Sequence, residues 1–230
     1  MAVAGYACPS DPDAGVILDL PAGTLVPMAA DPPGGRLKMV LTSYSASYGS
    51  FYVNPLPRPA NNCTPDARAI AQANGAINDV SPIRFASIGD GLGQTLLAAE
   101  KSVSLYRAIQ GGGGTSFGDH GWYVSGNWGD TLFTTFYPVN MPKKVAATAG
   151  FAHLLAASSQ HPAGVNGLMG DGSVRFIKDT IDSWPYSTTS GAPPTATSNL
   201  AGYWENLPRE GVWQAISTRS GGETVAGSDF

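Results

Sequence analysis

The feature that most constrains the fold is a hairpin signal in the segment HPAGVNGLMGDGSVRFIKDTID at 161–182. The pair Asp171-Gly172 stands between two apolar runs, and glycine readily adopts the positive φ that a tight two-residue turn requires. With a type I′ turn centred on this pair, Met169 would face Val174 across the hairpin. The segment therefore predicts two antiparallel strands, and it accounts for the Asp-Gly pair without any reaction.

His161 begins this segment, at the far end of the predicted hairpin and roughly opposite Asp182. Two interpretations are open: a histidine bonded to a backbone or carboxylate group, and a catalytic or metal-binding histidine. We favour the first, because the nearby Ser159 has no identified third partner, and adjacency in the sequence does not make a catalytic triad. We therefore expect no catalytic residues and no enzyme activity.

Glycine and proline shape the rest of the chain. The 230 residues include 29 glycines and 18 prolines, so turns and long loops should separate short elements. Only 13% of the residues are charged and 43% are hydrophobic, which suffices for a core and is typical of secreted β-rich proteins. The net charge of −4, with no basic cluster, argues against a nucleic-acid partner. No apolar run reaches the length of a membrane-spanning helix.

Segments rich in β-branched and aromatic residues indicate the strands. They lie within 16–28, 36–53, 83–88, 95–101 and 131–140. Short helices are expected within 66–77, starting near Asp66, and within 211–219, whereas 151–159 fits either a helix or a buried strand. The sequence thus predicts a single α+β domain over 1–230, made mostly of antiparallel β-sheet with long loops.

Cys8 and Cys63 are the two cysteines of the chain. In a composition typical of export they can form a disulfide that closes a loop of about 56 residues and stabilises the fold by about 4 kcal/mol. Two buried free thiols are the alternative. A zinc site is not expected from them, because two distant cysteines do not supply four close ligands.

Acidic residues provide the remaining metal and ion-pair candidates. Asp11 and Asp13 form an Asp-x-Asp pair in SDPDAG, which makes calcium the candidate metal, although the EF-hand spacing is absent and a turn capped by Asp is the preferred interpretation. No other cofactor is expected. Glu100 ends a predicted strand, and we expect it to pair with Arg107 or Arg84.

A Gly-rich loop carries acidic and aromatic side chains, namely Asp119, Trp122, Tyr123 and Trp128. Aromatic rings beside carboxylates on a β scaffold can stack on sugars, so a carbohydrate- or solute-binding module using the 117–137 loop is the alternative function. We favour the other interpretation, in which these rings cover the core beneath the loop.

Four segments, in this order, resemble the bacterial prepilin-type family, abundant in planctomycetes, whose C-terminal domain is named for a His-x9-Asp-Gly motif. They are YACPSDP (6–12), DGLGQTLLAAE (90–100), HPAGVNGLMGDGSVRFIKDTID (161–182) and GVWQAISTRSGGETV (211–225). The motif itself is matched at 161–172 by His161, Asp171 and Gly172, and the second segment contributes Asp90, Gly91 and Glu100. The same family is also filed as a domain of unknown function and under an old solute-binding label.

The resemblance implies a pilin- or pseudopilin-like globular head in the extracellular space or the cell envelope. Family members typically begin with a prepilin leader and a long apolar helix, and this sequence starts at MAVAGYACPSDP, so we expect a head that lacks its anchoring helix. The implied function is a non-catalytic structural subunit of a surface or type II secretion assembly. Its partners would be other pilin-like subunits through self-assembly, with membrane contact only through the missing helix.

Two structural features would separate the competing functions. An apolar patch left uncovered by the missing helix would favour the structural subunit. A deep aromatic cleft with Asp119 or Asp130 at its floor would favour the binding module.

Overall fold

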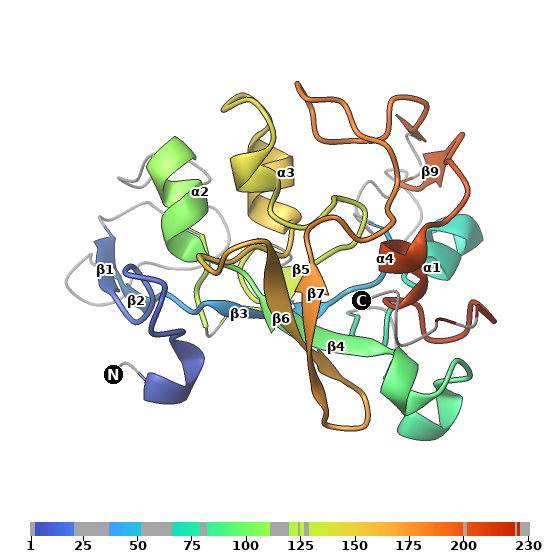
Figure 1. The fold of residues 1–230 in the computed structure, drawn as a ribbon, viewed down its shortest axis with the longest axis horizontal. Coiled ribbons are helices and arrows are strands. Elements are labelled where there is room, and N and C mark those ends of the chain that lie inside the picture. Colours follow the sequence, from blue (N-terminus) through green and yellow to red (C-terminus); the bar gives the residue numbers. More distant parts are fainter. Residues whose placement is uncertain are drawn as a thin grey trace.

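The structure is a computed structural model that describes residues 3–20, 37–51, 66–78, 82–110, 120–123, 125–126, 129–199, 202–223 and 225. These residues form the mixed α+β fold that the sequence predicts (Figure 1). A central five-stranded sheet has the strand order β5-β3-β4-β6-β7, and two small sheets, β1-β2 and β8-β9, lie apart from it.

The central sheet is antiparallel at every pairing except the one between β3 and β5. Its strands are β3 (Tyr44–Ser47), β4 (Leu96–Glu100), β5 (Leu132–Phe133), β6 (Gly164–Met169) and β7 (Val174–Lys178). The small sheets pair β1 (Ile17–Leu20) with β2 (Leu37–Val40) and β8 (Thr197–Ser198) with β9 (Trp204–Glu205).

Four short α-helices and several 3-10 turns complete the described fold. The α-helices are α1 (Ala67–Gln72), α2 (Val103–Gln110), α3 (Gly150–Leu155) and α4 (Val212–Ala215). The 3-10 helices are η1 (Ala4–Tyr6), η2 (Phe85–Ser87), η3 (Leu92–Gln94) and η5 (Met141–Lys143). Figure 1 shows α2 and α3 together on one side of the central sheet.

Several local predictions are confirmed. The helix within 66–77 is α1, and its start is fixed by Asp66, whose carboxylate accepts a hydrogen bond from the backbone N–H of Arg68 at 2.8 Å. The strand within 95–101 is β4, and 151–159 contains the helix α3. The strand predicted within 83–88 is wrong, because this segment forms the 3-10 helix η2.

The hairpin is present, but its register differs by one residue from the prediction. Leu168, rather than Met169, lies opposite Val174. The reason is the turn: only Gly172 has a positive φ, of 86°, whereas a type I′ turn needs positive φ at Asp171 as well. The Gly172 N–H donates to the Met169 carbonyl, and the hairpin closes through a three-residue loop that ends in this left-handed glycine.

This register decides which side chains face the core. Val165, Met169 and Ile177 are fully buried on one face of β6 and β7, in a cluster that also contains Trp213 of α4. The opposite face carries Val174, which is 66% exposed. The observed pairing places Leu168 beside Val174, and Asn166 beside Phe176, on this outward face. A register that differed by one residue would place each of them beside a residue of the opposite face.

Candidate functional site

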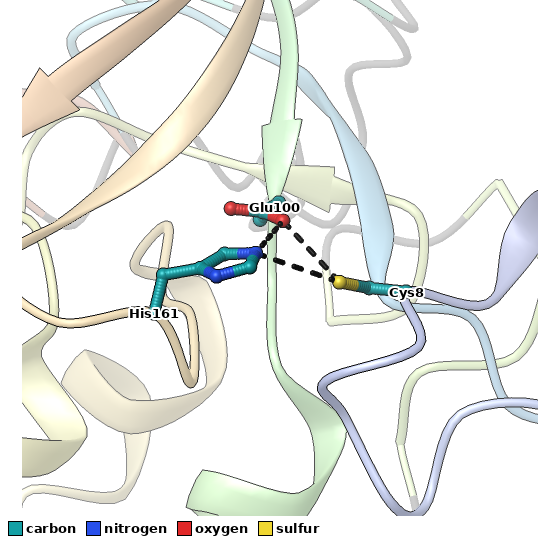
Figure 2. A group of neighbouring side chains, drawn as sticks. All are labelled: Cys8, Glu100 and His161. Carbon is teal, nitrogen blue, oxygen red and sulfur yellow. Dashed lines mark hydrogen bonds and ion pairs between the residues drawn. The ribbon is translucent and has the colours of Figure 1, made fainter.

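Three polar side chains from distant parts of the chain meet at one point (Figure 2). Cys8 lies in the loop after η1, Glu100 is the last residue of β4, and His161 precedes β6. The Nε2 atom of His161 lies 3.1 Å from Oε1 of Glu100, and the Cys8 Sγ lies 3.4 Å from the same Oε1. The Cys8 Sγ is also 3.8 Å from the His161 Nε2, so the three atoms form a closed triangle.

The carboxylate at the centre of this cluster is firmly held. Glu100 is buried, and its second oxygen, Oε2, accepts hydrogen bonds from the backbone N–H of Asn166 at 2.8 Å and from the Asn166 side-chain amide at 3.3 Å. The backbone N–H of His161 donates to Ser159 Oγ at 3.0 Å, which fixes the start of the histidine segment. Oε1 of Glu100 is therefore directed toward the thiol and the imidazole.

Cys8 has a free, buried thiol, so the predicted disulfide with Cys63 is not present. The backbone N–H of Cys8 donates to Ser43 Oγ at 2.5 Å, and its Sγ lies 3.0 Å from Ser10 Oγ. These contacts hold the thiol inside the cluster with Glu100 and His161. Cys63 itself lies outside the described residues.

The cluster does not have the geometry of a Cys-His-acid catalytic triad. In a triad the nucleophile and the orienting acid contact the two different nitrogens of the imidazole. Here Cys8 and Glu100 both approach the same nitrogen, Nε2 of His161. The arrangement brings three atoms with lone pairs toward a common centre and leaves no relay through the ring.

Glu100 and Arg107 do not form the ion pair that the sequence suggested. Glu100 contacts His161 and Cys8 instead, and Arg107 lies 3.5 Å from Asp13. Asp11 and Asp13, the candidate calcium ligands, make separate structural contacts. Asp11 caps helix α2, because its carboxylate oxygens accept hydrogen bonds from the first two backbone N–H groups of the helix, at 2.9 and 3.2 Å.

The other residues of the His-x9-Asp-Gly motif and of the second segment have structural contacts. The carboxylate of Asp171 accepts hydrogen bonds from Ser173, which hold the pKa of Asp171 below its ordinary value. Gly172 supplies the positive φ of the turn. Asp90 accepts hydrogen bonds from the C-terminal segment at 218–222, and Gly91 has a φ of 91° where the chain turns into η3.

Two of the predicted ligand-binding residues lie within the described part of the loop. Trp122 is buried and its ring stacks against His120, with centroids 5.8 Å apart, which agrees with a ring that covers the core. Tyr123 packs near Tyr6, with ring centroids 5.7 Å apart. The remaining two, at 119 and 128, lie outside the described residues.

Asp130 lies beneath this loop and holds it together. Its Oδ1 accepts hydrogen bonds from the backbone N–H groups of Gly121 at 2.8 Å and Trp122 at 3.3 Å, and it lies 3.1 Å from Nδ1 of His120. Burial alone would raise the pKa of Asp130, but the hydrogen bonds, that from His120 foremost, hold it below its ordinary value. Oδ1 of Asp130 is therefore occupied by the loop, and the whole side chain is buried beneath it.

The outward face of the central sheet is apolar. Register pairs align one row of side chains across four strands, namely Ala46, Ala98, Leu168 and Val174. A second row contains Tyr44 beside Glu100, and Asn166 beside Phe176. The exposed fractions are 37% for Tyr44, 39% for Leu168, 66% for Val174 and 44% for Phe176. We call this surface the apolar sheet face.

The Cys8–Glu100–His161 cluster borders the apolar sheet face, because Glu100 and Tyr44 are cross-strand partners. Burial raises the pKa of Tyr44, and the nearby Cys8 and Glu100 raise it further. No local pattern in the sequence indicates that these residues meet, although each of three resembling segments carries one of them.

Comparison with known proteins identifies a family and no activity. A family model described as "Protein of unknown function (DUF1559)" matches residues 1–183, a range that contains all three residues of the cluster. No curated protein and no solved structure matches the chain. Within the described residues, no helix combines the length and the apolar character needed to cross a bilayer.

Proposed function

Because the chain belongs to the family of proteins of unknown function DUF1559, its role has to be inferred from its own residues, and we propose that it is a non-catalytic structural subunit of a pilin- or pseudopilin-like assembly. The observation that carries this proposal is the apolar sheet face. We place the protein in the extracellular space or the cell envelope, an assignment that its low charged fraction of 13% supports.

The apolar sheet face has the character of a contact surface. Leu168, Val174 and Phe176 project from adjacent strands and remain exposed, while Val165, Met169 and Ile177 on the opposite face of the same hairpin are fully buried. Contiguous apolar surface on a soluble protein commonly marks an interaction site. Covering each of these half-exposed side chains would contribute on the order of 1 kcal/mol.

The occupant that we propose for this face is a neighbouring copy of the same chain, as in a self-assembling pilin-like polymer. The row Ala46, Ala98, Leu168 and Val174 contains no charged side chain, so packing it against another apolar surface leaves no buried charge without a partner. The small side chains of Ala46 and Ala98, beside Leu168 in the same row, also allow a neighbouring element to approach the sheet closely.

Self-assembly through this face can be tested with a double variant, Leu168→Lys and Val174→Lys. Both side chains point to solvent, so the subunit should still fold, which circular dichroism and thermal unfolding would verify.

Light scattering and electron microscopy should show oligomers or filaments of the unmodified chain and a monomeric double variant. The control is Phe85→Lys, which replaces a 64% exposed ring in η2, outside the central sheet, and should leave assembly unchanged. A monomer at all concentrations, or a double variant that assembles normally, would contradict the proposal.

A second candidate function is favoured by one specific observation. The rings of Tyr6, Tyr44 and Tyr123 line a shallow hollow together with Thr42 and Thr131. Aromatic faces next to hydroxyl groups suit the binding of sugars, so an extracellular carbohydrate-binding module is the alternative. Titration with soluble oligosaccharides, compared between the unmodified chain and Tyr123→Ala, would detect it as saturable binding that the variant loses.

A further inference from the structure

We propose that Cys8, Glu100 and His161 form a binding site for a zinc ion. The proposal is independent of the assembly proposed above, since it rests on the cluster alone and not on the apolar sheet face. Among the described residues, this is the group of histidine, cysteine and acidic side chains whose ligand atoms lie within 4.8 Å of one another.

The triangle of donor atoms has the size that a tetrahedral zinc ion requires. Its sides are 3.1, 3.4 and 3.8 Å. Zinc bond lengths to sulfur, nitrogen and oxygen in tetrahedral geometry imply separations of about 3.4 to 3.6 Å between ligand atoms. A point equidistant from three atoms with the observed separations lies about 2 Å from each, close to a zinc bond length. An ion therefore fits with shifts of a few tenths of an ångström.

The orientation of the side chains suits metal binding as well as the hydrogen bonds that link them. Sγ of Cys8, Oε1 of Glu100 and Nε2 of His161 all point to a common centre, as Figure 2 shows. All three atoms can donate lone pairs once the thiol is deprotonated and the imidazole carries its single proton on Nδ1, so zinc binding would release the thiol proton, and any second imidazole proton, to solvent. The ion would replace the shared protons that link the atoms in its absence.

A surrounding shell orients these ligands. Asn166 occupies Oε2 of Glu100 with two hydrogen bonds and leaves Oε1 for the ion. The backbone of Cys8 is held by Ser43, and that of His161 by Ser159. Such outer contacts fix ligand geometry in metal sites and strengthen metal binding.

The charges around the cluster also favour a cation. Glu100 is almost fully buried beside a thiol, and the group that can bring a positive charge against it is the imidazole of His161, which is charged only when protonated. Lys101, the next residue in the chain, does not compensate it, because its Nζ donates to the carbonyl oxygens of Gly129 and Asp130 at 2.7 and 3.3 Å. A divalent ion would neutralise the carboxylate and the thiolate together.

The donor set selects the metal and leaves a place for a further ligand. Thiolate and imidazole suit zinc, whereas calcium and magnesium prefer sites made of oxygen atoms alone. Three protein ligands leave one tetrahedral position open. The exposed side of the cluster is formed by His161, whose side chain is 35% exposed, and Ser10, so an ion can enter from solvent there.

Zinc would join three segments that are far apart in the sequence. Cys8 is separated from Glu100 by 92 positions and from His161 by 153. Each residue comes from a different one of the segments YACPSDP, DGLGQTLLAAE and HPAGVNGLMGDG. The ion would hold the N-terminal loop against the end of β4 and the start of the hairpin, the kind of link that a disulfide of Cys8 was expected to provide.

Competitive titration of the full chain with zinc, using a chromophoric chelator, tests the proposal. After removal of bound metal, the unmodified chain should bind one zinc ion per chain. Cys8→Ser and His161→Gln should each weaken this affinity at least about 100-fold and Glu100→Gln at least about 10-fold, in the range that loss of ligands and their supports produces. The matched control is His120→Gln, which alters the other histidine–carboxylate pair and should change the affinity less than about twofold.

Thermal unfolding with and without zinc separates loss of a ligand from loss of the fold. Zinc should raise the Tm of the unmodified chain and of His120→Gln, and should leave that of Cys8→Ser unchanged although this variant unfolds cooperatively. The proposal is overturned if the unmodified chain takes up no zinc. It is equally overturned if Cys8→Ser and His161→Gln bind zinc as the unmodified chain does.

Discussion

Two histidine–carboxylate pairs in this protein have nearly the same dimensions and different surroundings. In each, a ring nitrogen lies 3.1 Å from a carboxylate oxygen. The carboxylates of Asp130 and Glu100 are 1% and 4% exposed, and the side chains of His120 and His161 are 28% and 35% exposed. Distance and burial alone would assign both pairs the same role.

The difference lies in what else contacts the carboxylate oxygen. Oδ1 of Asp130 accepts hydrogen bonds from two backbone N–H groups and also contacts His120, so this pair holds a loop against the sheet. Oε1 of Glu100 faces a thiol and an imidazole. A backbone N–H keeps its proton and can only donate, whereas the Cys8 thiol, which donates to Oε1 of Glu100, and the His161 imidazole can each release a proton and bind an ion instead.

The largest effect that this comparison predicts is for Asp130→Ala. The variant would leave the N–H groups of Gly121 and Trp122 buried without an acceptor, so the free energy of unfolding should fall by about 3 kcal/mol. Urea denaturation would measure it, with and without zinc. A loss that zinc restores would contradict the purely structural role of this pair.

The second prediction concerns stabilisation of the whole fold by zinc. A ligand present at 100 times its Kd, and bound only by the folded state, adds about 2.7 kcal/mol to the free energy of unfolding. Urea denaturation in a zinc buffer should show this gain for the unmodified chain, and none for Glu100→Ala. An equal gain in Glu100→Ala would mean that zinc binds elsewhere.

The third prediction compares the contributions of Asp11 and Asp13 to the free energy of unfolding. Asp11→Ala should lower the free energy of unfolding by about 1 to 2 kcal/mol, because α2 loses its N-terminal cap. Asp13→Ala should cost less than about 0.5 kcal/mol, since it removes only a partly exposed ion pair with Arg107. Calcium should alter the unfolding of neither variant nor of the unmodified chain, and a calcium-dependent shift lost in both would reverse this assignment.

The fourth prediction concerns a pair in which both partners are carboxylates. Burial, and then the charge of Glu223, raise the pKa of Glu210 to about 6. Because the folded state holds this proton more tightly than the unfolded state, the contribution to stability is present below about pH 4.5 and is lost as the pH rises through 6.

The variant Glu210→Gln should therefore be more stable than the unmodified chain at pH 8, by on the order of 1 kcal/mol after allowance for solvent screening, and equally stable at pH 4. Urea denaturation across this pH range would measure the difference. A stability difference that is the same at both pH values would show that folding does not raise the pKa of Glu210.

Features that depend on neighbours in the sequence could be predicted from it. The helix cap at Asp66 and the hairpin around Asp171-Gly172 are set by local backbone chemistry, and both are present. The hairpin register was predicted wrongly because it depends on whether Asp171 adopts a positive φ, which the residue type permits but does not require. Helix α2 was missed because its cap, Asp11, lies far from it in the sequence.

The candidate site could not be assembled from the sequence, because its contacts span 92 and 153 positions. The composition favours a disulfide for Cys8, and two distant cysteines alone supply too few ligands for zinc. Local patterns carry no information on which distant carboxylate or imidazole approaches a thiol. That information lies in the strand order, which brings the end of β4 beside the start of β6.

The most direct test of the zinc site is X-ray absorption spectroscopy at the zinc edge, on the full chain loaded with one equivalent of the metal. The cluster predicts one sulfur neighbour at about 2.3 Å together with nitrogen and oxygen neighbours at about 2.0 to 2.1 Å. Cys8→Ser should remove the sulfur signal. A spectrum of the unmodified chain with no sulfur in the first shell would show that zinc does not bind at Cys8, Glu100 and His161.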